Sequence, residues 1–378
     1  MLSRNRHPWI DYARGICIIL VCYRHSFEGL INANFPTDSF PVLTLLNSAL
    51  VTFRMALFFF MSGMFISATL GKKGWADFVN DRVKMILYPL LIWGAIQITL
   101  QLLSNNYTNA RRSVADYLYL LIQPRREDQF WYLNALFFTS ILYAYFKGVL
   151  RLKMFHLMLT AIGFYALGAL YYHQHLNMRY LTLTFSVVPD IFHYYIFVFL
   201  GDAASQFVFS KRSESYFTSA RLFIPAGILF LSAHAYYTFL NSYYNKGYYV
   251  EFYMPATYLI VALSGCLITI QACFMLQKYK VMQFLRVIGY HSLYIYLMHV
   301  LVTSFTRVFF SKILHITYIP LMLAVSVSLG VVVPVIVYNF MMNKGMWWMF
   351  SLKKPQDAKN LFTLKYKLSR RPLETNTR

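Results

Sequence analysis

Most of the chain consists of apolar stretches of about 20 residues, separated by short segments that carry most of its charges. A helix of about 20 apolar residues is long enough to cross the hydrocarbon core of a lipid bilayer. The pattern therefore predicts an all-α protein, a polytopic membrane bundle with about ten transmembrane helices. We expect these helices near residues 12–32, 42–70, 83–103, 129–147, 154–173, 182–203, 220–240, 253–277, 288–310 and 318–347.

The basic residues predict the orientation of these helices. If the N-terminus faces the cytoplasm, 24 of the 35 lysines and arginines fall on cytoplasmic loops and the C-terminal segment. Seven fall on the opposite loops, and four lie within or at the edges of the spans. Because lysine and arginine are enriched on the cytoplasmic side of membrane proteins, we expect both termini in the cytoplasm. The domain organisation is then a transmembrane domain at 1–347 and a basic cytoplasmic tail at 348–378.

Composition narrows the function classes. With 58% hydrophobic and 13% charged residues, the chain is not a soluble globular domain. The net charge of +21 would suit a nucleic-acid partner. The lysines and arginines lie mostly in short loops and the tail, however, which is typical of a signal for orientation in the membrane, so we expect no nucleic-acid partner. All four cysteines lie in apolar runs without metal-site spacing, which predicts buried side chains, no disulfide framework and no metal site: Cys17, Cys22, Cys266 and Cys273.

The first apolar stretch carries charges that a membrane segment normally lacks. Arg14 and His25 are eleven residues apart, which places them on one face of a helix about 16.5 Å apart along its axis. Asp11 precedes Arg14 by three residues and is within reach of an ion pair. Ionisable residues inside a membrane usually face a bundle interior or a watery cavity and mark a functional site. The alternative is that Asp11 and Arg14 lie at the cytoplasmic headgroups, while Arg24 and His25 extend to the outer surface.

Five motifs in sequence order resemble the acyltransferase-3 family of membrane acyltransferases. The first is Asp-Tyr-x-Arg-Gly, followed at a fixed spacing by His25, and the others are "FRMALFFFMSGMFIS" (53–67), "DRVKMILYPLLIW" (81–93), "FWYLNALFF" (130–138) and "IGYHSLYIYLMH" (288–299). The first helix most resembles the branch of sugar O-acetylases of the fucose 4-O-acetylase type. Two positions depart from that branch, since Arg24 stands where it commonly has glycine and Arg54 where it often has histidine.

The resemblance implies an acyltransferase that takes acetyl-coenzyme A (acetyl-CoA) from the cytoplasm and acylates a glycan outside the cell or linked to a lipid. His25 would be the general base or a relay that carries the acyl group, since neutral imidazole suits proton abstraction. Arg14, held by Asp11, would bind donor phosphate or orient the thioester, and Arg82 and Lys84 are further candidates for coenzyme phosphates. The alternative for Arg82 and Lys84 is a topology signal.

Other residues are candidates for catalysis or acceptor binding. Arg54 lies in the middle of an apolar span, where a charge is costly, and is counted with the catalytic residues. Trp131 would stack on a sugar ring or anchor the membrane interface. Glu127 and Asp128 would bind acceptor hydroxyls or pair with the neighbouring Arg125 and Arg126. His299 would help to close the site or make a structural hydrogen bond.

A transporter or flippase for a polysaccharide intermediate is the rival prediction, because buried charges also line transport paths. Inverted repeats with broken helices would favour it, and the sequence shows none that we can identify. A receptor or scaffold would leave the charges within the spans unexplained. We therefore predict a multi-pass enzyme of a bacterial inner membrane, with the bilayer and a glycan or lipid-linked saccharide as its partners and a role in modifying cell-envelope polysaccharide.

Overall fold

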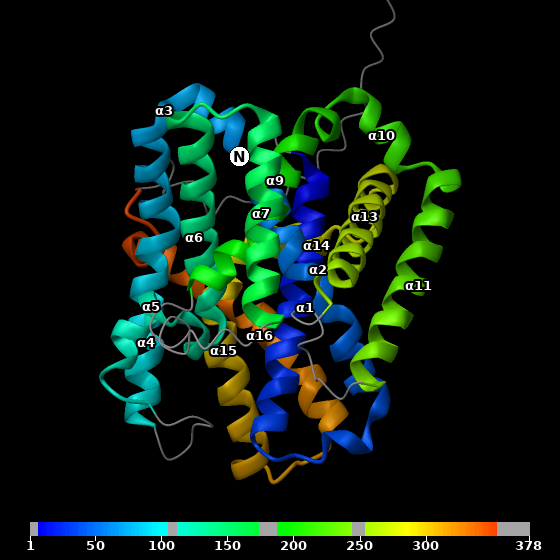
Figure 1. The fold of residues 1–378 in the computed structure, drawn as a ribbon. Helices are drawn as coiled ribbons and strands as arrows, with labels where there is room; N and C mark the ends of the chain where they lie inside the picture. Colours follow the sequence, from blue (N-terminus) through cyan, green and yellow to red (C-terminus); the bar gives the residue numbers. More distant parts are fainter. Residues whose placement is uncertain (1–6, 105–111, 174–186, 244–253, 354–378) are drawn as a thin grey trace, which may run out of the picture.

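The computed structural model describes residues 7–104, 112–173, 187–243 and 254–353. All regular secondary structure in these ranges is helical, which confirms the predicted all-α class (Figure 1). The helices are α1 (Pro8–Asn32), α2 (Pro41–Gly63), α3 (Ile66–Arg82), α4 (Tyr88–Leu103), α5 (Asp116–Ile122), α6 (Trp131–Ala144), α7 (Met154–His173), α9 (Val187–Val208), α10 (Lys211–Phe217), α11 (Ala220–Tyr243), α13 (Pro255–Tyr279), α14 (Phe284–Tyr290), α15 (Ser292–Val308) and α16 (Ile319–Asn343).

Seven helices in the described part of the chain are long and apolar enough to cross a membrane. They agree with seven of the predicted spans and make the protein an integral membrane protein: Pro41–Gly63, Ile66–Leu103, Val187–Val208, Ala220–Leu240, Pro255–Tyr279, Ser292–Ile313 and Ile319–Asn343. The other three predicted spans are also helical, as α1, α6 and α7, but they are shorter or more interrupted by polar residues. The count of ten therefore stays a prediction, as does the cytoplasmic location of the termini.

Three predicted boundaries need comment. The span expected at 42–70 is wrong at its end, because α2 stops at Gly63 and α3 begins at Ile66. The segment before residue 83, expected as a loop, belongs to α3, which bends at Gly74, where φ is +76° and only glycine is unstrained. The start of the span at 182–203 and residues 354–378 of the predicted tail lie outside the described residues.

Helix α1 runs through the middle of the bundle and packs against α2, α13, α14, α15 and α16 (Figure 1). Glycines allow the closest of these approaches. A Cβ atom on Gly289 of α14 would collide with the carbonyl group of Asp11, and one on Gly15 of α1 would collide with Leu285. The four cysteines are free and buried in the apolar core, as predicted for small packed side chains. The central position of α1 places its charged residues inside the protein.

The bundle has two ends that matter for the site. The first end, at the top of Figure 1, holds the start of α1, the first part of α3, and α10. The second end holds the ends of α1, α4 and α15 and the turn that joins α15 to α16. The first end is the one that the sequence predicts to face the cytoplasm.

Candidate active site

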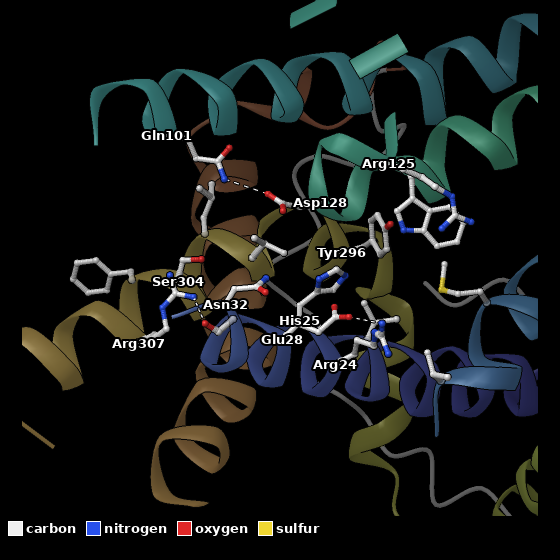
Figure 2. Close-up of a pocket in the computed structure, with 18 of the residues that line it drawn as sticks. Arg24, His25, Glu28, Asn32, Gln101, Arg125, Asp128, Tyr296, Ser304 and Arg307 are labelled. Carbon is white, nitrogen blue, oxygen red and sulfur yellow. Dashed lines mark hydrogen bonds and ion pairs between the residues drawn. The ribbon is translucent and has the colours of Figure 1, made fainter. Parts of the chain in front are cut away.

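A cavity of about 920 Å³ lies toward the second end of the bundle. Its walls come from α1, α2, α4, α9, α13 and α15, together with the segment that precedes α6 (Figure 2). Four predicted site residues line it: His25, Arg54, Asp128 and Trp131. A cavity of this size holds a small ligand or the end of a larger one.

His25 projects from α1 into the cavity (Figure 2). Its ring lies against the ring of His299 on α15, with 5.1 Å between ring centroids. The Nδ1 atom of His299 is 2.9 Å from the carbonyl oxygen of Tyr296 and 3.1 Å from that of Ile295. A carbonyl only accepts hydrogen bonds, so Nδ1 of His299 carries a proton. Its Nε2 atom is buried and has no hydrogen-bond partner within the described residues. His299 thus combines the predicted structural hydrogen bond with a place beside His25.

Arg54 reaches the cavity from α2 and is 7% exposed. Its Nη1 atom donates to the carbonyl oxygen of Leu20 at 3.3 Å, and no carboxylate lies within 4.0 Å of it among the described residues. Arg24, next to His25, is instead paired with Glu28 one turn later on the same helix (Figure 2). Arg54 therefore brings to the cavity, beside His25, a positive charge that has no ion pair of its own, although Glu28, paired with Arg24, also acts on it electrostatically.

The segment before α6 forms a polar network at the rim. Arg112 pairs with Glu127 and with Asp128, each at 3.0 Å. Asp128 also accepts hydrogen bonds from Gln97 and Gln101 of α4, and Figure 2 shows the bond from Gln101. The partner of the two acids is thus Arg112, not Arg125 or Arg126 as one alternative expected. Burial raises the pKa of Glu127 to about 7, while Arg112 acts in the opposite direction.

Arg125 covers one face of Trp131. Its guanidinium carbon is 4.4 Å from the centre of the indole, and its Nε atom donates to Asp190 at 2.8 Å. Both residues line the cavity, and Figure 2 labels Arg125 there. A sugar ring that stacks on this indole would have to use the other face or displace Arg125.

The remaining predicted residues lie away from this cavity. Asp11 is buried and Arg14 partly buried near the first end of α1. Arg14 and Arg82 both interact electrostatically with the phenol of Tyr132, so the structure brings these two arginines together. Lys84 is close to Asp81 instead. The predicted donor residues and the predicted base are therefore on opposite sides of the protein interior.

Aromatic rings in edge-on and tilted contact separate the two groups. Tyr132 contacts Tyr296, with ring centroids 5.2 Å apart, and Tyr296 contacts His299 at 5.8 Å. The hydroxyl of Tyr296 donates to the carbonyl oxygen of Gln129. A row of rings thus runs from Tyr132, beside the arginines of the first group, to the histidine pair in the cavity.

Two residues of the site did not emerge from the sequence as candidates. Arg112 lies within a predicted loop, between the spans at 83–103 and 129–147, and gives no local signal. Arg307 lies in α15 and lines the cavity, and its position within a predicted span is the same signal that identified Arg54. Within the described residues no group of three or more metal-ligating side chains occurs.

The apolar helices and the enclosed histidine and arginines define a polytopic membrane protein with a polar internal site. A family profile described as an acyltransferase domain matches residues 7–339, and the chain belongs to this acyltransferase-3 family of membrane acyltransferases. It is also similar to nodulation protein NolL of Sinorhizobium fredii, with 27% identity over 213 residues, which cover 56% of this chain and 51% of that protein. NolL of Mesorhizobium japonicum is 26% identical over 199 residues, covering 53% and 48%.

The chain thus spans about half the length of the curated relatives that it matches. No solved structure matches it. Membership of an acyltransferase family favours an enzyme over the transporter considered from the sequence.

Proposed function

We propose that this protein transfers an acetyl group from cytoplasmic acetyl-CoA to a hydroxyl group of an extracytoplasmic or lipid-linked glycan. The observation that supports it best is the position of His25, which lines the cavity beside His299 and an arginine without a carboxylate partner. The proposed location is the inner membrane of a bacterial cell.

In the reaction, the acceptor hydroxyl oxygen attacks the thioester carbonyl carbon while His25 takes the hydroxyl proton. The C–S bond then breaks, the acetyl group stays on the acceptor oxygen, and coenzyme A leaves as a thiol after it takes up the proton. Arg54 stabilises the negative charge that develops on the carbonyl oxygen. In the alternative route, His25 is acetylated first and then gives the acetyl group to the acceptor.

In this proposal the arginines near the first end of the bundle bind the acetyl donor. Arg14 and Arg82 are partly buried and lie close enough to act on the same phenol. Guanidinium groups bind phosphate well, because they present several donors in a fixed plane. These two side chains fit the phosphates of acetyl-CoA, and the aromatic rings beyond them lead toward His25.

The test uses membrane vesicles that carry the protein and its glycan acceptor. Radiolabelled acetyl-CoA is added on the side of the membrane where the N-terminus of the protein lies. The variants are His25→Ala and, as a matched control, His315→Ala, which changes an exposed histidine in the turn after α15. We expect label in glycan for the wild type and the control, and at least about a 100-fold loss of rate for His25→Ala, as removal of a general base predicts.

The position of the label distinguishes the two routes, since label that stays on the protein in samples without acceptor, for the wild type but not for His25→Ala, supports the relay. A His25→Ala protein that transfers label at the wild-type rate would remove His25 from the mechanism. A wild type that transfers nothing from acetyl-CoA but moves the intact glycan across the membrane would overturn the proposal in favour of a transporter.

A further inference from the structure

Five arginines line the cavity, but only three of them form an ion pair with a carboxylate within 4.0 Å among the described residues. Arg24 pairs with Glu28, Arg112 with Glu127 and Asp128, and Arg125 with Asp190; these pairs are structural, and Arg54 and Arg307 remain. Arg54 lies beside His25, and the proposed reaction already gives it a role. The proposed reaction gives Arg307 no role.

Arg307 is 8% exposed and lies near the end of α15. Its Nη1 atom donates to the carbonyl oxygen of Gly29 at 2.7 Å. Gly29 is four residues beyond His25 on α1, so it is displaced by about 6 Å along the helix, toward the second end. A Cβ atom on Gly29 would be only 2.8 Å from Nη1 of Arg307, so the glycine leaves the space that the guanidinium occupies.

Two more polar side chains share this part of the wall. Ser304 lies one turn before Arg307 on α15, and Asn32 lies near the end of α1; both line the cavity. In Figure 2 the three labelled side chains lie in the part of the cavity away from Arg125. Together they offer guanidinium, hydroxyl and amide hydrogen atoms, which is the donor set that binds an oxyanion.

A buried charge without a partner is costly, and proteins normally compensate it. The nearby acid of the lining, Asp128, acts on Arg307 electrostatically but forms no ion pair with it, because Arg112, Gln97 and Gln101 already hold its carboxylate. A ligand that brings its own negative charge would therefore gain most of its affinity at Arg307, where a guanidinium and an anion pair in a largely enclosed space.

We propose that the cavity binds an acceptor that carries an oxyanion, a carboxylate or phosphate group, through Arg307, Ser304 and Asn32. This inference rests on the proposed function, because it specifies the chemical class of the acceptor. The anionic group lies about one helical turn beyond His25, so the acylated hydroxyl is on a neighbouring part of the same saccharide. The phosphates of coenzyme A are the competing source of an anion, but Arg14 and Arg82 at the other end of the interior suit them better.

The first measurement uses inorganic phosphate as the probe. Purified full-length protein in a phosphorus-free detergent is titrated with phosphate, and binding is followed by the broadening of the phosphorus NMR signal. The variants are Arg307→Gln, which removes the charge, and Gly29→Ala, whose methyl group displaces the guanidinium without removing it. The matched control is Lys312→Gln, which removes one positive charge from an exposed position just beyond α15.

We expect saturable phosphate binding to the wild type and to Lys312→Gln. The dissociation constant should rise at least tenfold in Arg307→Gln and severalfold in Gly29→Ala, and Arg307→Lys should recover part of the loss. Equal phosphate binding by the wild type and Arg307→Gln, or no saturable binding by the wild type, would overturn the proposal.

The second measurement identifies the source of the anion. Binding of coenzyme A by isothermal titration calorimetry should be the same in the wild type and in Arg307→Gln. If coenzyme A affinity falls together with phosphate affinity, the site belongs to the donor and the acceptor assignment is wrong. If the wild type binds phosphate through Arg307 but does not bind coenzyme A, the anion site stands and the proposed acetyl transfer from acetyl-CoA fails.

Discussion

Glu127 is a nearly completely buried acid at the rim of the cavity, and burial raises its pKa from an ordinary value of 4.5 to about 7. The folded protein then binds a proton more tightly than the unfolded chain between these two values. The free energy of unfolding therefore falls as the pH rises from about 4.5 to 7 and changes little above that range. We expect the apparent melting temperature of the detergent-purified protein to decrease by a few degrees over this interval.

Glu127→Gln tests the origin of that slope, because glutamine keeps the shape of protonated glutamate and does not titrate. Its melting temperature should be nearly independent of pH between 5 and 7. Glu214→Gln, which changes an exposed acid of α10, should keep the wild-type slope. A slope of equal size in Glu127→Gln would assign the pH dependence to another group.

At the scale of helices, the crossing of α2 and α9 supports the cavity wall. Gly63 of α2 lies against the backbone carbonyl of Val198, and Gly201 of α9 lies against that of Phe60. A methyl group at either position would meet backbone atoms, which cannot rotate away. We expect Gly63→Ala to separate the helices and to destabilise the protein by about 1–3 kcal/mol, as overpacking of a close contact does.

The measurement is thermal unfolding in detergent together with acyl transfer. Because α2 carries Arg54 and α9 carries Tyr194, both of which line the cavity, Gly63→Ala should also lower the rate. The control is Gly71→Ala in α3, where no atom lies within 4 Å of the new Cβ, and it should change neither property. Wild-type stability in Gly63→Ala would show that the two helices adapt without cost.

Helices and charged positions could be predicted from the sequence to different extents. The sequence predicts the helices because the length of an apolar run is a local property, but it does not predict the break between Gly63 and Ile66, which lies inside such a run. It predicts His25 and Arg54 as site residues because a charge in an apolar run is itself a local anomaly. It does not predict the contact of His25 with His299, since that contact depends on how helices far apart in sequence pack.

Arg112 illustrates the same limit. Its ion pairs with Glu127 and Asp128 cross a gap of fifteen residues or more and depend on the fold of the rim. The nearer arginines, Arg125 and Arg126, were the natural partners in the sequence. In the structure, Arg125 turns toward Asp190 and Trp131 instead, where it gains both an ion pair and a stacking contact.

For the whole molecule, the orientation in the membrane decides which side supplies the acetyl donor. The excess of basic residues predicts that the first end of the bundle faces the cytoplasm. The first part of α3 and the start of α10 lie at that end (Figure 1) and carry the exposed Lys72 and Lys211. The connections from α1 to α2 and from α15 to α16 lie at the second end and carry the exposed Ser39 and His315. The native cysteines are buried, so a single introduced cysteine gives a clear signal with a membrane-impermeant maleimide.

In intact cells, Ser39→Cys and His315→Cys should react with the maleimide, whereas Lys72→Cys and Lys211→Cys should react only after the membrane is permeabilised. The cysteine-bearing variants should transfer acetyl groups as the wild type does, because none of the four positions lines the cavity. The reverse labelling pattern would place Arg14 and Arg82 outside the cell, where acetyl-CoA is absent, and would separate the proposed donor site from its substrate. The expected pattern would leave the cavity of His25 and Arg307 opening toward the side where an envelope glycan is found.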